Sequence, residues 1–320
     1  MNRLHAVLAA LREGPGYVSG AAIAARLEIS RTAVWKYVKQ LEGLGYRLEK
    51  VKGKGYQLTE TPDRLYPWEI DRRLTTRYMG RNVIYRDRAD STNGIAFKLA
   101  LDGAPEGTCV VAETQSAGKG RLQRPWVSPY AANLYLSVVL RPKIHPSQVY
   151  PVTFLSSLAV YDTVRAYEID PKLKWPNDVL VGGRKICGTL LELSTEADAV
   201  RFVVVGIGLN VNMRENEMTE EIRTKATSLA LEAKKVFERA QVCGILLANL
   251  ERYYDLAKKD GLKAICGLWE EKARIKGTYL EVVQPERVFR GVAEGIDTEG
   301  ALLLNQEGTI TRIIAGDVTF

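Results

Sequence analysis

Histidine and cysteine are scarce in this chain of 320 residues. Only His5 and His145 are present, so we do not expect a histidine-based catalytic triad or a multi-histidine metal site. The cysteines are Cys109, Cys187, Cys243 and Cys266. They lie far apart without a C-x-x-C pair, which argues against a disulfide framework or a zinc ribbon and favours reduced, mostly buried thiols. Catalysis must therefore rest on lysine, arginine, carboxylates and backbone amides.

The chain also lacks long apolar runs. No stretch approaches the roughly 20 apolar residues that a membrane span needs, and the N-terminus has no apolar run with a small-residue cleavage site. With 46% hydrophobic and 26% charged residues, the composition is that of a globular protein of two or three domains. We therefore expect a cytoplasmic protein with no membrane partner.

The net charge of +7 is concentrated at one end of the chain. Residues 1–62 contain 10 Lys+Arg and 5 Asp+Glu, whereas the remaining 258 residues contain 35 and 33. A small basic end beside a nearly neutral body predicts that this end contacts a polyanion.

The local pattern of the basic end predicts three short helices and a hairpin. Apolar residues over 4–11 have helical spacing, and Ser19 and Ser30 are plausible N-caps of the second and third helices. Residues 45–58 form two short strands joined by a Lys-Gly-Lys-Gly turn. Helix, helix, helix and basic hairpin together predict a winged helix-turn-helix.

Charged and polar side chains of this domain can contact DNA. Thr32 and Lys36, near the start of the third helix, can reach base edges, while the cations supply salt-dependent phosphate contacts. The expected DNA-binding residues are Ser30, Arg31, Thr32, Lys36, Lys39, Lys52 and Lys54. The alternative is that these charges only solvate a small interaction module.

From about residue 82 strands and helices alternate. A strand over 82–86 runs into the polar turn 90–93 and a helix that ends at Leu101. Small polar side chains and free amides at such a turn form a polar-ligand site, although a simple helix N-cap has the same appearance.

The loop 116–126, after the apolar strand 109–115, combines two glycines, three cations and Trp126. Glycines let the backbone bend closely around a ligand, cations neutralise phosphate or carboxylate, and tryptophan offers a stacking face. The spacing matches neither a phosphate-binding P-loop nor the dinucleotide fingerprint. Chemistry alone leaves a nucleotide site and a flexible basic surface loop as alternatives.

Two further segments carry possible ligand contacts. Residues 178–193 read as a hairpin in which Lys185 can clamp a phosphoryl group and Asp178 can orient it or hold Mg²⁺. An exposed cross-strand ion pair is the alternative. In the strand over 201–212, Gly206 and Gly208 permit close approach by a ligand or by another backbone.

Together, six motifs have the order and spacing found in biotin protein ligases. They are Asp90-Ser-Thr-Asn93, Gln115-Ser-Ala-Gly-Lys-Gly-Arg121, Arg124-Pro-Trp126, Lys174-Trp-Pro-Asn-Asp178, Lys185-Ile-Cys-Gly188 and Gly206-Ile-Gly-Leu-Asn210. With the N-terminal winged helix, the whole chain resembles the bifunctional bacterial kind, which also represses biotin synthesis genes.

The resemblance implies an α+β multidomain fold. A winged helix-turn-helix over 1–62 precedes a mixed α/β ligase domain of the biotin/lipoate ligase type over 63–273. Residues 235–273 read as one long helix and a shorter one. Strands over 278–283, 288–296, 301–304 and 309–314 predict a small barrel, which in the family is an SH3-like cap over 274–320. We favour a structural role for this cap over a direct substrate contact.

The resemblance also implies an activity. Biotin and MgATP give biotinyl-5′-AMP and pyrophosphate, and a lysine of a biotin carboxyl carrier protein then takes the biotinyl group. Bound biotinyl-AMP orders loops around 116–126 and 213–226 and promotes a homodimer on operator DNA. A metabolite-binding regulator without catalysis and a lipoate or octanoate ligase are the rival interpretations.

Site residues follow by the same resemblance. Lys185, Arg121 and Asp178 are the expected catalytic residues, with Asp178 also as metal ligand. The expected biotin-binding residues are Ser91, Thr92, Asn93, Gln115, Lys119, Gly120, Arg121, Lys185, Gly188, Gly206 and Gly208. The expected ATP-binding residues are Lys119, Arg121, Arg124, Trp126, Asn177, Asp178, Lys185 and Asn210.

The chain departs from the family pattern at two points. Lys119 stands where the family often has arginine, which keeps the charge but loses the bidentate fork. The sequence ends at Phe320 without the C-terminal arginine that contacts ATP in some relatives.

Overall fold

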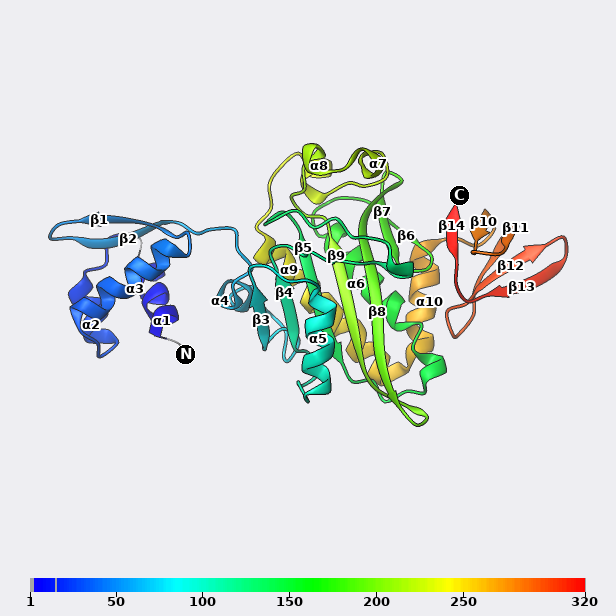
Figure 1. Ribbon diagram of the computed structural model, residues 1–320, viewed down its shortest axis with the longest axis horizontal. Coiled ribbons are helices and arrows are strands. Elements are labelled where there is room, and N and C mark those ends of the chain that lie inside the picture. The colour runs from blue at the N-terminus through cyan, green and yellow to red at the C-terminus, as the bar shows by residue number, and fades with distance from the viewer. Residues whose placement is uncertain (1–2, 15, 320) are drawn as a thin grey trace. The chain divides into compact units, whose positions relative to one another are not determined.

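The computed structural model describes residues 3–14 and 16–319. The chain divides into two compact units, one up to Asp63 and the other from Arg64 onward, and each is described by itself (Figure 1).

The first unit contains the predicted winged helix-turn-helix. Its helices are α1 (Arg3–Arg12), α2 (Gly20–Arg26) and α3 (Arg31–Gly43), followed by the antiparallel strands β1 (Arg47–Val51) and β2 (Gly55–Glu60). The predicted caps are confirmed, because the hydroxyl oxygens of Ser19 and Ser30 accept hydrogen bonds from the backbone N–H groups of Ala22 and Ala33. The helices bury their apolar stripes against one another.

A short β-bridge, which the sequence did not predict, ties the hairpin to the segment before α2. Val18 pairs with Tyr56 through two backbone hydrogen bonds of 2.8 and 2.9 Å. Gly55 makes this approach possible, since its φ is +114° and a Cβ there would overlap the carbonyl oxygen of Val18.

The second unit is built on a seven-stranded mixed sheet. The strands are β3 (Val83–Arg86), β4 (Cys109–Ala112), β5 (Leu134–Leu140), β6 (Pro171–Lys174), β7 (Asp178–Val181), β8 (Arg184–Glu196) and β9 (Ala199–Leu209). They are ordered β3-β4-β5-β9-β8-β7-β6; β3 and β4 run parallel, and the other neighbours run antiparallel. The apolar side chains of β5 are buried along its whole length.

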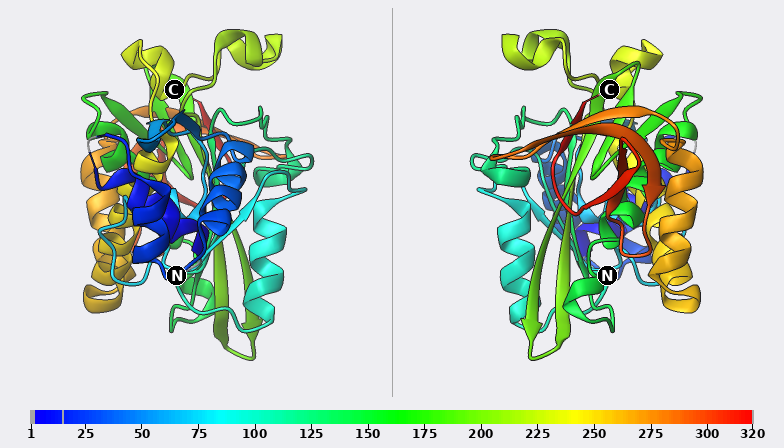
Figure 2. Two further views of the ribbon diagram at one scale, coloured as in Figure 1. Left: turned by 90° about the vertical axis from the view of Figure 1, so that its left-hand side faces the viewer. Right: turned by 90° about the vertical axis from the view of Figure 1, so that its right-hand side faces the viewer.

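Helices cover both faces of this sheet (Figure 2). On one face lies α5 (Thr92–Leu101), and on the other lie α6 (Val152–Arg165), α9 (Arg239–Asp260) and α10 (Leu262–Ala273). The predicted long and short helices over 235–273 are thus confirmed. Short helices α4 (Pro67–Asp71), α7 (Glu220–Arg223) and α8 (Leu229–Ala233) lie in the connections.

The C-terminal residues form a curved five-stranded antiparallel sheet. Its strands are β10 (Tyr279–Val283), β11 (Val288–Ile296), β12 (Leu302–Gln306), β13 (Thr309–Ile313) and β14 (Asp317–Thr319), in the order β13-β12-β11-β10-β14. The first four were predicted, and β14 was not. The sheet packs on the rest of the second unit, since Trp175 Nε1 donates to the carbonyl of Gly300 at 3.1 Å.

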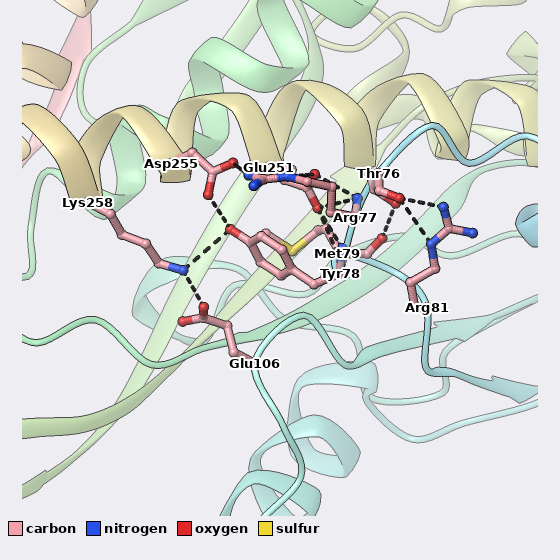
Figure 3. Close-up of polar contacts among 9 residues, drawn as sticks. All are labelled: Thr76, Arg77, Tyr78, Met79, Arg81, Glu106, Glu251, Asp255 and Lys258. Carbon is pink, nitrogen blue, oxygen red and sulfur yellow. Dashed lines mark hydrogen bonds and ion pairs between the residues drawn. The ribbon is translucent and has the colours of Figure 1, made fainter.

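A carboxylate on α9 holds the chain that leads into β3 (Figure 3). Glu251 accepts hydrogen bonds from the backbone N–H groups of Arg77, Tyr78 and Met79 at 2.8 to 3.0 Å. Burial alone would raise the pKa of Glu251, but these hydrogen bonds and the charge of Arg77 outweigh burial, so its pKa lies below the ordinary value.

The lowered pKa predicts a pH-dependent loss when Glu251 is replaced by glutamine. A carboxyl whose pKa is lowered by folding stabilises the protein above its unfolded pKa, about 4.3, and this stabilisation is lost as pH falls through the folded pKa. We expect Glu251→Gln to lower the free energy of unfolding by about 1–3 kcal/mol at pH 7. Denaturant unfolding of both proteins between pH 7 and about pH 3.5 should show this difference shrinking; a constant difference would contradict the interpretation.

Candidate functional site

One cavity of about 350 Å³ in the second unit gathers the predicted ligand residues. It lies on the sheet face that carries α5 and is bounded by the loop 116–126 and by residues around α7. The predicted residues that line it are Ser91, Thr92, Asn93, Gln115, Lys119, Gly120, Arg121, Arg124, Trp126, Asn177, Asp178, Lys185, Gly188, Gly206, Gly208 and Asn210. Segments up to about 120 residues apart thus meet in one site.

The end of the cavity nearest α5 is lined by neutral hydrogen-bonding groups. Gln115 Oε1 accepts from the backbone N–H and the hydroxyl of Thr92 at 2.9 and 3.1 Å, and the Ser137 hydroxyl lies 2.6 Å from Asn93 Oδ1. The Ser91 hydroxyl caps α5 by accepting a hydrogen bond from the backbone N–H of Gly94, and Ser91 also lines the cavity. The turn 90–93 is therefore both a helix N-cap and part of a polar cavity wall. Such an arrangement suits a ligand head that is polar but uncharged.

The glycines of β9 make room for side chains of the site. A Cβ on Gly206 would overlap the amide of Asn93, and one on Gly208 would lie 2.5 Å from the Trp126 ring. The sequence leaves a ligand and another backbone as alternatives for what approaches these glycines. The structure places the side chains of Asn93 and Trp126 against them, and both glycines also line the cavity.

The other end of the cavity is cationic and aromatic. Lys185 Nζ lies 2.7 Å from Asp178 Oδ1 and 5.5 Å from the centre of the Trp126 ring. The side chains of Lys185 and Asp178 are 34% and 20% exposed, so this ion pair lies in the cavity wall and not on open surface. The indole nitrogen of Trp126 is buried and has no hydrogen-bond partner within residues 3–14 and 16–319.

The loop 116–126 is folded onto itself and onto the C-terminal sheet. Backbone hydrogen bonds of 2.8 Å join Gly120 to Arg124 and Trp126 to Gly118. The guanidinium of Arg121 donates to the carbonyl of Gly316 at 3.4 Å, and Arg124 forms an ion pair of 2.6 Å with Asp317. These contacts argue against a free basic surface loop.

The contacts to Gly316 and Asp317 were missed by sequence reasoning. Asp317 lines the cavity, so the C-terminal sheet contributes a residue to the site beyond the structural role that we favoured. The segment 316–319 is too short for a periodic pattern, and its partners lie almost 200 residues away in the chain. Phe320 itself lies outside the described residues.

Comparison with known proteins shows relatives along nearly the whole chain. The chain is 40% identical to "Bifunctional ligase/repressor BirA" of Bacillus subtilis, over 95% of this chain and 94% of the relative. It is 30% identical to the protein of the same name from Escherichia coli, over 98% and 95% of the two chains. The chain belongs to the biotin protein ligase family.

Profiles of three domain families match this biotin protein ligase family member in order. They are an HTH domain at residues 3–57, the Biotin/lipoate A/B protein ligase family at 85–210 and the Biotin protein ligase C terminal domain at 281–320. Among solved structures, the biotin protein ligase of Aquifex aeolicus in complex with biotin and ATP is 30% identical, with a TM-score of 0.63. That match covers 75% of this chain and 98% of the Aquifex chain.

The seven predicted DNA-binding residues of this family member are exposed in the first unit. Three of them have partners: Ser30 caps α3, Lys39 forms an ion pair with Glu42 at 3.2 Å, and Lys54 Nζ lies 5.6 Å from the centre of the Tyr17 ring. Trp35, 50% exposed, lies on the same face of α3 as Thr32 and Lys36, and sequence reasoning did not select it.

Metal ligands are sparse in the ligase site. The described residues contain no group of three or more His, Cys, Asp or Glu side chains placed to hold an ion. Asp178 lines the cavity together with Asp317, which is paired with Arg124. A carboxylate at this place suits Mg²⁺ because Mg²⁺ is usually held by one or two carboxylates together with substrate phosphates. Within the same described part of the chain, no helix has the length and apolar character needed to cross a bilayer.

Proposed function

We propose that this chain is an ATP-dependent biotin protein ligase that also represses biotin biosynthesis genes. It joins biotin to ATP, giving biotinyl-5′-AMP and pyrophosphate, and transfers biotin to a lysine of a biotin carboxyl carrier protein. The observation that carries this proposal is one cavity in which a neutral hydrogen-bonding end adjoins a cationic, aromatic end. Sequence similarity to a bifunctional ligase/repressor over 95% of the chain supports both roles.

The neutral end of the cavity suits the ureido ring of biotin. That ring has one carbonyl acceptor and two N–H donors, and Ser91, Thr92, Asn93 and Gln115 offer both kinds of partner. The biotin carboxylate then points toward Lys119 and Arg121, whose positive charges favour it electrostatically. Gly120 and Gly188 keep the intervening backbone close to the ligand.

The cationic end suits the triphosphate and the base. When the biotin carboxylate attacks the α-phosphorus, a bond to pyrophosphate breaks and negative charge develops on the phosphoryl oxygens. Lys185, with Arg121 and Arg124, lines the region where this charge develops and stabilises it. Trp126 offers a ring face for adenine, while Asn177 and Asn210 offer polar contacts.

Mg²⁺ fits this end through Asp178 and the phosphates of ATP. When bound, the ion neutralises phosphate charge and so assists departure of pyrophosphate. Asp178 also orients Lys185 through their ion pair. This carboxylate therefore serves both the ion and the lysine.

Repression is assigned to the first unit. We divide the chain into a DNA-binding domain (1–62), a catalytic domain (63–273) and a C-terminal domain (274–320). Biotinyl-AMP orders the loops 116–126 and 213–226 and promotes a homodimer that binds operator DNA. Residues 222, 225 and 226 line the cavity, so a ligand bound there can contact the loop 213–226 directly. Four free, buried cysteines suit a reducing cytoplasm.

The activity is tested by biotin-dependent exchange of pyrophosphate into ATP. We expect exchange with biotin and none with lipoate or octanoate. A metabolite-binding regulator shows no exchange with any of them, and a lipoate or octanoate ligase shows the reverse preference. Either result overturns the proposed ligase.

The repressor role is tested by sedimentation and by operator binding in the same buffer. Biotin with MgATP is expected to raise the dimer fraction and operator affinity together, because ordered loops complete the dimer surface. Biotin without ATP is the control. A dimer fraction that does not change when biotinyl-AMP is bound contradicts the proposed ligand-dependent dimerisation.

A further inference from the structure

A carboxylate that is not among the predicted site residues contacts two side chains that line the cavity. Glu192 lies on β8 opposite Val204 of β9, and its side chain is 30% exposed. Its Oε2 accepts a hydrogen bond from Asn93 Nδ2 at 2.8 Å, and its Oε1 lies 3.5 Å from Lys119 Nζ. Asn93 belongs to α5, whereas Lys119 belongs to the loop 116–126.

We propose that Glu192 is a positioning residue that fixes which groups of the biotin pocket donate and which accept hydrogen bonds. An ionised carboxylate can only accept, so the NH₂ group of Asn93 must face Glu192 and its carbonyl oxygen must face away. Asn93 is 5% exposed, and its amide lies over Gly206, so it is enclosed on the sheet. The inference rests on the proposed function, since it takes biotin as the ligand.

The orientation of Asn93 dictates the next hydrogen bonds in the pocket. Its Oδ1 faces the hydroxyl of Ser137 at 2.6 Å, and because a hydroxyl carries one proton, Ser137 gives that proton to Asn93. Ser137 Oγ is then an acceptor toward Thr92, 2.8 Å away. The Thr92 hydroxyl therefore donates, either to Ser137 or to Gln115 Oε1.

A fixed hydrogen-bond direction matters for a ligand such as a cyclic urea. The carbonyl of the urea needs hydrogen-bond donors, and its N–H groups need acceptors. When a buried donor faces another donor, or an acceptor faces another acceptor, no hydrogen bond forms and the cost of removing both groups from water is not recovered. Lys119 supplies the counter-charge that a partly buried carboxylate requires. Glu192 thus determines which groups of the pocket donate and which accept hydrogen bonds, without itself contacting the ligand.

The test compares biotin binding, without ATP, to wild type and four variants by calorimetry. Glu192→Gln keeps the size of the side chain but lets the residue donate or accept, so Asn93 is no longer forced into one orientation; we expect biotin to bind about tenfold more weakly. Asn93→Asp places two carboxylates face to face and is expected to bind biotin more weakly still. Thermal unfolding checks that each variant is folded.

The decisive variant exchanges the two groups. In Asn93→Asp/Glu192→Gln, the new amide donates to the new carboxylate, and Ser137 still donates to position 93, so the direction toward Thr92 is restored. We expect this double variant to bind biotin more tightly than either single variant. An exchange variant no better than either single variant overturns the proposal, as does wild-type affinity in Glu192→Gln.

Glu196→Gln provides the matched control. This glutamate is exposed near the end of the same strand, so its replacement removes the same charge and should leave biotin affinity unchanged. An equal loss in Glu196→Gln shows a general charge effect and overturns the role of Glu192. If wild type itself does not bind biotin, the proposed function fails first, which distinguishes the two failures.

Discussion

Replacing Lys185 by methionine should slow formation of biotinyl-AMP by about 100- to 1,000-fold at saturating biotin and ATP. The ammonium group lies beside Trp126 and Asp178 at the cationic end of the cavity, where the attacked phosphoryl group is expected. Because the charge on that group grows in the transition state, the loss should fall mainly on kcat. Single-turnover release of pyrophosphate measures it directly.

Lys172→Met is the control for this prediction. Lys172 lies in β6, the edge strand of the same sheet, and is exposed, so the variant loses the same charge away from the cavity. It should retain the wild-type rate. An increase in the KM for ATP with unchanged kcat in Lys185→Met would assign Lys185 to ground-state binding and contradict its catalytic role.

The parts of the fold that the sequence predicted well depend on local patterns. Ser19 and Ser30 act as helix caps because each hydroxyl accepts a hydrogen bond from a free backbone N–H group in the first turn of the helix that follows it. This contact is local, so no tertiary interaction is needed to predict it. The hairpin predicted over 178–193 turns at Gly182-Gly183, where both φ angles are positive and glycine adopts them without strain. In these cases neighbouring residues carry the whole signal.

The site was predictable as a set of residues but not as a set of contacts. The motifs identified which segments meet, while the pairing of Arg124 with Asp317 depends on a three-residue strand at the far end of the chain. Glu192 occupies an ordinary position in a long strand. Nothing in its sequence neighbours indicates that Asn93 will lie against it, since the contact arises from how α5 packs on the sheet.

Buried charge is the clearest feature that sequence reasoning could not find. Arg239 begins the amphipathic helix α9, where a solvent-exposed cation is the ordinary expectation, yet its side chain and that of Glu113 are both fully buried. The two lie 2.8 Å apart, and Glu113 also accepts the backbone N–H of Leu65. The pair joins the start of the second unit to the strand that leads to Gln115.

Arg239→Met should therefore be among the most destabilising single changes in the second unit. Methionine fills much of the volume but leaves the Glu113 carboxylate buried without its principal counter-charge, which typically costs about 3–5 kcal/mol. Arg252→Met on the same helix is the matched control. Arg252 is 59% exposed and pairs with Asp162, which keeps Lys272, so the loss should stay below about 1 kcal/mol.

A double variant separates the charge effect from the packing effect. Glu113→Gln/Arg239→Met removes both charges, while the glutamine carbonyl can still accept the N–H of Leu65. If the unpaired carboxylate is the cause, denaturant unfolding should find the double variant more stable than Arg239→Met by about 1–3 kcal/mol. If it is no more stable, the loss in Arg239→Met comes from packing and from the hydrogen bond that Arg239 donates to the carbonyl of Asn133.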